Sequence, residues 1–404
     1  MLFCNNIRKI ITGDKTYLRP QMCFFCGFIC MALFIVGCRI LPSPMVVPQT
    51  NSGEVSPGVW SNFQCDPAHT GSIEATLLPP LEISWVVKGG GKVISSPAVA
   101  GDVIYWATLG RFIYATNRFT GETIWRNRYA GIITGSPVVQ DNIVYIGIQT
   151  PENTFYALDA ATGEHLWGVE MPDVQSSAAI GGSRVVTGDE HGLVSCFTTQ
   201  TGDLKWTFQA DDAIRAPVVI DRDLVCVGSL DNRLYVLNLA DGMLRWSYET
   251  EGSIYSAPAV TDSLIYISSY DKTVRALARQ NGELRWRVDL GDRIFSTPTV
   301  FDEALYVGCN DGAVYAFNRF TGMLLWSFQT GGIITSSPAV TATHLFIGSY
   351  DHHLYVLDRQ RGELMDSITL GGPIEASPVI IQNRLYLGCD DQKLYAFSSQ
   401  MPED

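Results

Sequence analysis

The stretch Ala157-Leu-Asp-Ala-Ala-Thr-Gly-Glu-His-Leu-Trp167 decides the fold, because its pattern returns about every forty residues. A small or apolar residue and an Asp or Asn end one predicted strand, a Thr-Gly turn follows, and a Trp stands four residues after the Gly. Seven of the nine Trp residues therefore share one position of the repeat: Trp85, Trp125, Trp167, Trp206, Trp246, Trp286 and Trp326. The next place in the series holds Asp366.

A repeat of this length is the first property to explain, because it determines the fold. Forty residues hold four strands of roughly five or six residues with short turns between them. In the sixth unit, apolar stretches at 294–300, 304–308, 313–317 and 323–328 are separated by turn-forming residues. Since no long stretch of the repeats has apolar residues at helical spacing, the fold is predicted to be all-β.

A second marker counts the units independently. The first strand of each unit carries a small residue followed by Pro. These pairs are Ser96-Pro97, Ser136-Pro137, Ala216-Pro217, Ala257-Pro258, Thr297-Pro298, Ser337-Pro338 and Ser377-Pro378, and the third unit has Ser177-Ala178 in this place. Pro within a strand is restricted to edges and bulges, and the innermost strand of a propeller blade is an edge. Eight first strands predict eight blades.

The fourth strands are offset from this count. One of them, around Trp85, precedes the first Pro, and the last unit has none after residues 394–397. The strand around Trp85 can complete the last blade and so close the ring, which protects edges that would otherwise pair with other chains. We therefore predict an eight-bladed β-propeller of four-stranded antiparallel blades, with each Trp packed between blades and a looser joint at Asp366.

The repeated pattern, with the Ser-Pro strand before it, resembles the repeats of the pyrroloquinoline quinone (PQQ)-like propeller family over roughly residues 60–397. Residues 60–71 also resemble the lead-in segment of that family. One branch of the family is the quinoprotein dehydrogenases, which the resemblance links to PQQ, a calcium ion, an adjacent Cys pair and a catalytic Asp. This chain has neither an adjacent Cys pair nor a sizeable insertion between repeats. Its layout is closer to the other branch, the BamB-type outer-membrane assembly lipoproteins, which implies no catalysis and no cofactor.

Residues 1–37 are predicted to be an export signal, with a basic stretch before the uncharged apolar run at 22–37. The run ends in Ile35-Val-Gly-Cys38, which resembles the lipobox of bacterial lipoproteins and makes Cys38 the expected lipid attachment site. The alternative is an uncleaved signal anchor. Residues 38–59, rich in Pro and Ser, are predicted to be a flexible tether, and residues 60–400 the propeller.

Composition excludes some classes of function. A net charge of −13 disfavours nucleic-acid binding, because phosphate backbones are repelled by an acidic protein. Five of the ten cysteines lie in the leader or at the lipid site, while Cys196, Cys226, Cys309 and Cys389 fall in strand patterns and are predicted to be buried apolar residues. No zinc spacing occurs outside the leader, and Cys65 stays unassigned.

The first strands must supply any site on the propeller axis. The residues two before each Pro, or its equivalent, are small except Arg215, which is expected to present a cation to the channel or to pair with a nearby acid such as Asp211 or Asp212. One residue earlier stand Ile94, Thr134, Gln175, Ile214, Tyr255, Phe295, Thr335 and Glu375. The candidate channel-mouth binding residues are thus Gln175, Arg215, Tyr255, Phe295 and Glu375, with blade-interface packing as the alternative.

Other polar residues do not suggest a site. The turn acids Asp231, Asp271, Asp311, Asp351 and Asp391 recur at forty-residue spacing, so they lie in successive blades and cannot share a metal ion. No motif proposes catalytic residues, and no metal is expected. The predicted function is a non-catalytic, lipid-anchored propeller of the bacterial cell envelope. It is expected to be a monomer that binds a protein partner. A PQQ-dependent dehydrogenase or a glycan- or peptide-binding propeller is the alternative.

Overall fold

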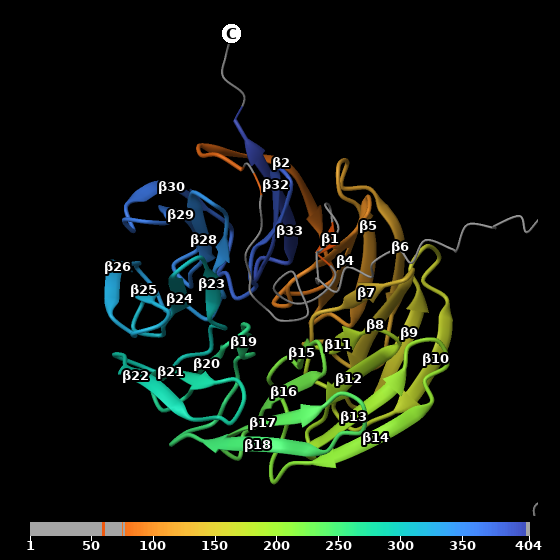
Figure 1. Cartoon of the computed structure of the whole chain (residues 1–404). Coiled ribbons are helices and arrows are strands. Elements are labelled where there is room, and N and C mark those ends of the chain that lie inside the picture. Colours follow the sequence, from red (N-terminus) through yellow and green to blue (C-terminus); the bar gives the residue numbers. More distant parts are fainter. Residues whose placement is uncertain (1–58, 61–74, 76, 401–404) are drawn as a thin grey trace, which may run out of the picture. The chain divides into compact units, whose positions relative to one another are not determined.

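The computed structural model describes residues 59–60, 75 and 77–400, and these form strands and turns without a helix. The strands make eight sheets that follow one another around a ring (Figure 1). The predicted all-β, eight-bladed propeller is confirmed. Within these residues there is accordingly no helix long and apolar enough to cross a membrane. Residues 1–58, which hold the predicted leader, Cys38 and nearly all of the tether, and Cys65 lie outside the described residues.

Each blade is numbered by the order of its innermost strand in the chain. Blade 1 comprises β1(Val59–Trp60), β3(Ala98–Ala100), β4(Val103–Thr108), β5(Phe112–Asn117) and β6(Thr123–Arg128), and blade 2 comprises β7(Val138–Gln140), β8(Ile143–Ile148), β9(Thr154–Asp159) and β10(His165–Glu170). Blade 3 comprises β11(Ala179–Gly181), β12(Arg184–Gly188), β13(Leu193–Thr198) and β14(Leu204–Gln209), and blade 4 comprises β15(Val219–Asp221), β16(Leu224–Gly228), β17(Arg233–Asn238) and β18(Leu244–Glu249).

Blades 5 to 8 repeat the same order from the axis outwards. Blade 5 comprises β19(Ala259–Val260), β20(Leu264–Ser268), β21(Thr273–Ala278) and β22(Leu284–Asp289), and blade 6 comprises β23(Thr299–Phe301), β24(Ala304–Gly308), β25(Ala313–Asn318) and β26(Leu324–Gln329). Blade 7 comprises β27(Ala339–Val340), β28(His344–Gly348), β29(His353–Asp358) and β30(Leu364–Thr369), and blade 8 comprises β31(Val379–Ile381), β32(Arg384–Cys389), β33(Lys393–Ser399) and β2(Leu81–Lys88).

The ring closes through blade 8, as the offset of the fourth strands predicts. Strand β2 pairs antiparallel with β33, and Trp85 lies opposite Ala396 in the register. Figure 1 shows β2 at the outer side of β32 and β33, although it comes from the other end of the propeller sequence. A further strand, β1, pairs with β3 at the inner edge of blade 1, so Val59, the last residue of the predicted tether, belongs to the sheet.

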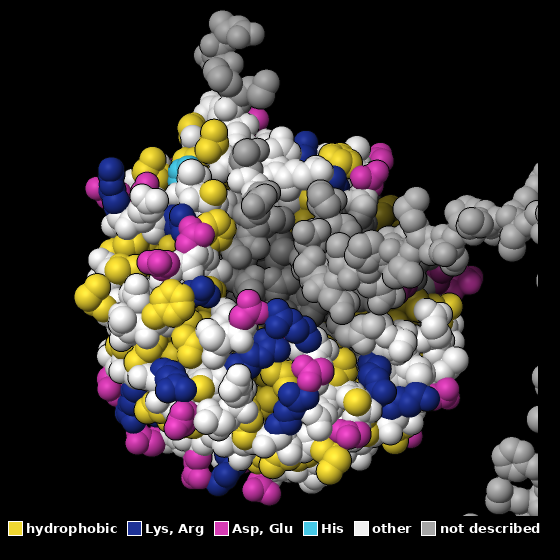
Figure 2. Space-filling view, in the orientation of Figure 1, with side chains coloured by type: hydrophobic (Ala, Val, Ile, Leu, Met, Phe, Trp, Pro, Cys, Tyr) yellow, Lys and Arg dark blue, Asp and Glu magenta, His cyan; other side chains and the backbone are white. Residues whose placement is uncertain are grey.

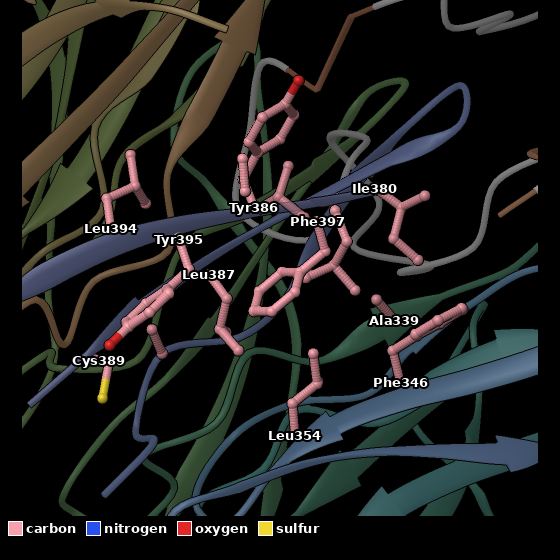
Figure 3. Packing of buried hydrophobic residues seen from close by; sticks show 14 of the residues in the cluster. Ala339, Phe346, Leu354, Ile380, Tyr386, Leu387, Cys389, Leu394, Tyr395 and Phe397 are labelled. Carbon is pink, nitrogen blue, oxygen red and sulfur yellow. The ribbon is translucent and has the colours of Figure 1, made fainter. Parts of the chain in front are cut away.

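The apolar core lies between neighbouring blades. The second strand of each blade is covered on both faces by adjacent blades, and its residues are almost all buried, as in β16 and β24. The outer strands alternate between exposed and covered residues, as in β26. Figure 3 shows this packing where blade 7 meets blade 8, with Leu354 directed towards the ring of Phe397 and Phe346 in the same buried cluster.

The opening stretch of the repeat forms the turn between the third and fourth strands. Asp159 accepts hydrogen bonds from the backbone N–H groups of Ala161 and Thr162, at 3.0 and 2.8 Å, which fixes the turn. Gly163 has a φ of +76°, a conformation that favours glycine. Ala157 lies opposite Trp167 in the ladder, so a small residue leaves room for the indole. Cys196 has this place opposite Trp206.

Every repeated Trp lies across a blade joint, which is the contact between consecutive blades. Trp326 of blade 6 packs against Gly362 in the turn of blade 7, where an added Cβ would lie 2.5 Å from the indole. All seven indole N–H groups donate to a backbone carbonyl of the next blade, at 2.8–3.1 Å.

The joint between blades 7 and 8 is built differently. Its outer strand carries Asp366, whose carboxylate accepts a hydrogen bond of 2.8 Å from the backbone N–H of Leu81. Leu81 begins β2, where the chain enters blade 8 from its N-terminal side, so no turn links β33 to β2. A Trp at this position would have no turn glycine to pack against, which explains the interruption of the series.

Candidate functional site

The channel-mouth candidates come together in one cavity on the propeller axis, of about 170 Å³. Among the residues that line it, one from each blade stands at an equivalent position, and we call this set the mouth ring: Ile94, Thr134, Gln175, Arg215, Tyr255, Phe295, Thr335 and Glu375. All five predicted binding residues belong to the mouth ring. The ring lies in the segments that lead into the innermost strands, where the chain arrives from the outer strand of the preceding blade.

The structure corrects the predicted register of the fourth unit by one residue. Ile214 is fully buried and packs against Gly188, as Ile254 packs against Gly228 in the next blade. Arg215 is therefore the equivalent of Tyr255, and Pro217 occupies the place of the small residue that precedes Pro elsewhere. The prediction that placed Ile214 at the mouth was wrong, because Pro217 stands one position earlier in its unit than the other prolines do.

Below the mouth ring, side-chain hydroxyls link the blades around the axis. In this hydroxyl belt, the backbone N–H of one blade donates to the hydroxyl of the next. The bonds are Ser96 to Ser136, Ser136 to Ser177, Ala257 to Thr297, Thr297 to Ser337, Ser337 to Ser377 and Ser377 to Ser96, at 2.8–3.1 Å. The belt is interrupted at Pro217 and Ala257, which have no hydroxyl. These buried bonds fix the positions of the segments that carry the mouth ring.

Arg215 forms an ion pair with Glu190, which differs from the predicted partners Asp211 and Asp212. Its Nε and one terminal nitrogen each donate to a different carboxylate oxygen of Glu190, both at 2.8 Å. This two-point geometry is the strongest form of the interaction. Hydrogen bonding to Glu190 raises the pKa of Arg215. The positive charge of the guanidinium at the mouth is therefore balanced by the Glu190 carboxylate.

Aromatic rings form the adjacent part of the wall. Tyr255 and Phe295, from blades 5 and 6, have ring centroids 5.2 Å apart. Tyr270 lies behind them, 5.7 Å from Tyr255 and 5.6 Å from Phe295, with an edge-on contact to the latter. Arg293 covers the outer face of Tyr270, 4.7 Å from its centroid. These distances are those of favourable aromatic contacts, so the three rings form one rigid wall.

Blade 8 supplies an acidic part of the mouth. Burial raises the pKa of Glu375, and the neighbouring Asp390 raises it further. Asp390 is deeply buried and accepts a bond of 2.5 Å from the Lys92 ammonium through Oδ2. Tyr350 lies beside Glu375, and burial raises the pKa of its phenol above the usual range. Of these two carboxyl groups, Asp390 is the one that forms the ion pair with Lys92.

Sequence reasoning missed the residues that stand behind the mouth ring. Glu190, Tyr270, Tyr350 and Asp390 occupy one position in the turn between the second and third strands, and the last three come just before a repeated turn acid. They recur at intervals of about forty residues, so this position could have been recognised as variable in an otherwise regular repeat. Its proximity to the mouth depends on how the turn folds over the next blade, which the repeat pattern does not reveal.

The turn acids have structural partners. Asp311 and Asp351 each accept a hydrogen bond from a tyrosine four residues later, at 2.8 and 2.7 Å. Asp271 instead pairs with the buried Arg275. In the part of the chain that the structure describes, no three His, Cys, Asp or Glu side chains come together to hold a metal ion. The four strand cysteines are free and buried.

On the face that Figure 2 displays, charged side chains outside the axis do not gather into a patch of one sign. On the face displayed in Figure 2, basic and acidic side chains are interspersed, with apolar side chains between them. Arg222 and Asp262 make one such surface pair, at 2.5 Å between adjacent blades. A mixed surface of this kind does not by itself identify a binding face, so the axial cavity is the main candidate.

The architecture defines an eight-bladed propeller with a small polar and aromatic cavity on its axis. Its sequence matches the family described as outer membrane protein assembly factor BamB, in overlapping segments at residues 59–206, 151–257, 252–332 and 310–401. The chain belongs to this family.

Curated relatives of two kinds match parts of the chain. The outer membrane protein assembly factor BamB of Burkholderia pseudomallei is 25% identical over 136 residues, which is 32% of this chain and 35% of that protein. The polyvinylalcohol dehydrogenase of a Sphingopyxis species is 26% identical over 146 residues, which is 34% of this chain and 21% of that enzyme. The matched segments thus span about a third or less of these relatives.

Solved structures extend the likeness to nearly the whole fold. BamB from Moraxella catarrhalis has a TM-score of 0.69 at 22% identity, covering 79% of this chain and 99% of that one. A europium-containing methanol dehydrogenase has a TM-score of 0.75 at 13% identity, covering 85% and 98%. At these identities the likeness establishes the fold and does not distinguish a binding protein from an enzyme.

Proposed function

We propose that this protein is a non-catalytic, lipid-anchored propeller that serves as a binding scaffold in the bacterial cell envelope. Membership of the BamB family along the whole propeller carries the proposal. It supports a role in outer-membrane protein assembly and a location at the outer membrane. Cys38 would carry the lipid, and the residues up to 58 would connect it to the propeller. The monomeric protein would bind an envelope protein through the mouth ring.

The composition of the mouth ring supports protein binding. It combines the half-buried rings of Tyr255 and Phe295 with the polar groups of Gln175, Arg215 and Glu375 within one cavity. Aromatic residues and Arg are the side chains that most often dominate protein interfaces. Because the ring rests on the hydroxyl belt, these side chains are held in place before a partner arrives, which lowers the entropic cost of binding.

Cross-linking in intact cells followed by affinity purification would test this function. We expect the protein to capture a BamA-type assembly protein, and the yield to fall when Arg215 and Phe295 are both replaced by Ala. Arg361→Ala, an exposed change on the outer rim with a 72% exposed side chain, is the matched control. Unchanged capture by the double mouth variant would show that the partner binds elsewhere, and the absence of any assembly protein would contradict the proposal.

A PQQ-dependent dehydrogenase is the second candidate, because a polyvinylalcohol dehydrogenase is among the relatives. The residues on the axis do not fit that group well. The cavity of about 170 Å³ is smaller than the roughly 300–1,000 Å³ of usual cofactor sites. The described residues also supply no cluster of carboxylates for a calcium ion. Adding PQQ and Ca²⁺ to the purified protein should give no dye-linked oxidation of alcohols or sugars; quinone-dependent turnover would overturn the scaffold proposal.

A further inference from the structure

The mouth has one carboxyl group more than it has cations. Arg215 is paired with Glu190, and Lys92 is paired with Asp390. Among the described residues, Glu375 makes no ion pair, although it lines the cavity. The fixed charge of the mouth is therefore negative, and the unbalanced carboxyl is the one that faces the cavity.

Asp390, which lies behind Glu375, adds to this excess of negative charge. The Asp390 side chain is only 5% exposed, and its Oδ1 is buried without a hydrogen-bond partner among the described residues. Two adjacent carboxyl groups repel one another when both are ionised, and a shared proton or another positive group relieves this repulsion. A buried acceptor without a donor is also unfavourable, because it has lost its hydrogen bonds to water. Both features favour a positively charged hydrogen-bond donor at this point.

The aromatic wall favours the same kind of ligand. Tyr255 and Phe295 line the cavity together with Glu375, and the faces of aromatic rings attract cations. Carboxylates and aromatic rings around one small cavity are the combination used to recognise ammonium groups in proteins. An anion would have to displace Glu190 from its two-point contact with Arg215. The size of the cavity limits the occupant to a small group.

We propose that the mouth ring binds an organic cation, an alkylammonium or guanidinium group, between Glu375 and the rings of Tyr255 and Phe295. The group can belong to a free amine or to a Lys or Arg side chain of a protein. If the cation is a Lys or Arg side chain of a protein, the mouth is the place where the proposed scaffold binds its partner. The chemistry of recognition is the same in both cases.

Titration calorimetry on the full chain, purified in detergent, would test the proposal with n-butylammonium and with butyrate, a probe of similar length and opposite charge. We expect n-butylammonium to bind and butyrate not to bind. Glu375→Gln keeps the shape of the side chain and should weaken n-butylammonium binding by about tenfold, as expected for the loss of a charged hydrogen bond. Phe295→Leu should weaken it by about threefold through the lost cation–π contact.

Glu363→Gln, an exposed carboxyl with 66% side-chain exposure on the outer rim, is the matched control and should leave binding unchanged. Thermal unfolding of each variant verifies that it is folded. Equal binding of butyrate, or unchanged affinity in Glu375→Gln, would overturn the proposal, as would the absence of binding by either probe.

Peptides distinguish the two sources of the cation. Acetyl-Gly-Lys-Gly-amide should bind with at least the affinity of n-butylammonium if the natural ligand is a side chain, and its Nε-acetylated form should not bind. Binding of n-butylammonium alone would identify a free amine. If Glu375→Gln abolishes amine binding but leaves capture of the assembly protein intact, the cation site stands and the partner's use of the mouth is wrong.

Discussion

The indole N–H of Trp326 in blade 6 donates a hydrogen bond of 3.0 Å to the carbonyl oxygen of Arg359 in blade 7. The same ring lies against Gly362, so one side chain joins two blades by a polar and an apolar contact. The equivalent bond runs from Trp246 to Arg279, at 3.1 Å. The repeated Trp is therefore the main element of the joint, and its removal has predictable consequences.

Trp246→Ala should lower the free energy of unfolding by about 3–5 kcal/mol, because it leaves a large cavity between blades 4 and 5. Urea denaturation followed by circular dichroism measures this loss. Trp246→Phe retains most of the apolar contact and loses the hydrogen bond to Arg279, so it should cost less. Stability of Trp246→Ala equal to that of the parent would contradict the packing role.

Asp366→Ala should destabilise the protein by about 1 kcal/mol, since the partly buried N–H of Leu81 then loses its acceptor. Asp366→Asn keeps an acceptor oxygen and serves as the control. We expect hydrogen exchange at Leu81 to accelerate in the Ala variant and to change little in the Asn variant. Equal exchange in all three proteins would show that this bond contributes nothing to the joint.

Ser377→Ala removes one acceptor of the hydroxyl belt. The buried N–H of Ser337, which donates to Ser377 at 2.9 Å, would lose its partner at a cost of about 1–3 kcal/mol. Ala257→Ser offers the reverse comparison, because Pro217 in the preceding blade has no N–H to donate to a new hydroxyl. Thermal unfolding should therefore show a loss in the first variant and no gain in the second. A gain in Ala257→Ser would contradict this account of the interruption.

Glu375→Gln should stabilise the free protein at neutral pH. The pKa of Glu375 is raised in the folded protein above its ordinary value of 4.5, so its favourable contribution is present below that value and is lost as the pH rises through the raised pKa. Above that range the ionised carboxyl opposes folding, whereas Gln does not. Urea midpoints at pH 7.5 and pH 4 measure the difference, which should be larger at pH 7.5. A difference independent of pH would contradict the burial of this carboxyl.

Cys38→Ala should release the protein from membranes if Cys38 carries the lipid. Fractionation of cells into membrane and soluble parts measures the change, and labelling with a radioactive fatty acid should be lost in parallel. Cys65→Ala is the control and should stay in the membrane fraction. Continued membrane attachment of Cys38→Ala would favour the uncleaved signal anchor.

Much of the fold could be predicted because the same pattern of strands and turns recurs in every repeat. The Trp series and the small-Pro series are two independent records of the same eight units, and their offset predicted the pairing of β2 with β33. The register failed where a single unit departs from the pattern. Pro217 stands one position earlier than the other prolines, and only the burial of Ile214 against Gly188 reveals this.

The candidate site could be predicted only in part. Residues on the segments that lead into the innermost strands, such as Gln175 and Glu375, lie near the axis in any propeller, so the assignment of those strands places them. Glu190 and Asp390 reach the mouth through turns that fold over the next blade. Their contacts with Arg215 and Lys92 depend on side-chain direction and on the distance between blades. Neither quantity is encoded in the spacing of a repeat.

The closing pair of strands has a consequence for the order of folding. Ser84 of β2 and Ser398 of β33 share a hydrogen bond of 2.8 Å, although 314 positions separate them in the sequence. Blades 2 to 7 can each form from contiguous residues, whereas blade 8 must wait until nearly the whole propeller has been synthesised. A contact of such high sequence separation carries a large loop-closure entropy and slows folding. In a nascent chain β2 would thus stay unpaired until β33 has been synthesised, and its free edge could meanwhile pair with other chains unless a chaperone covers it.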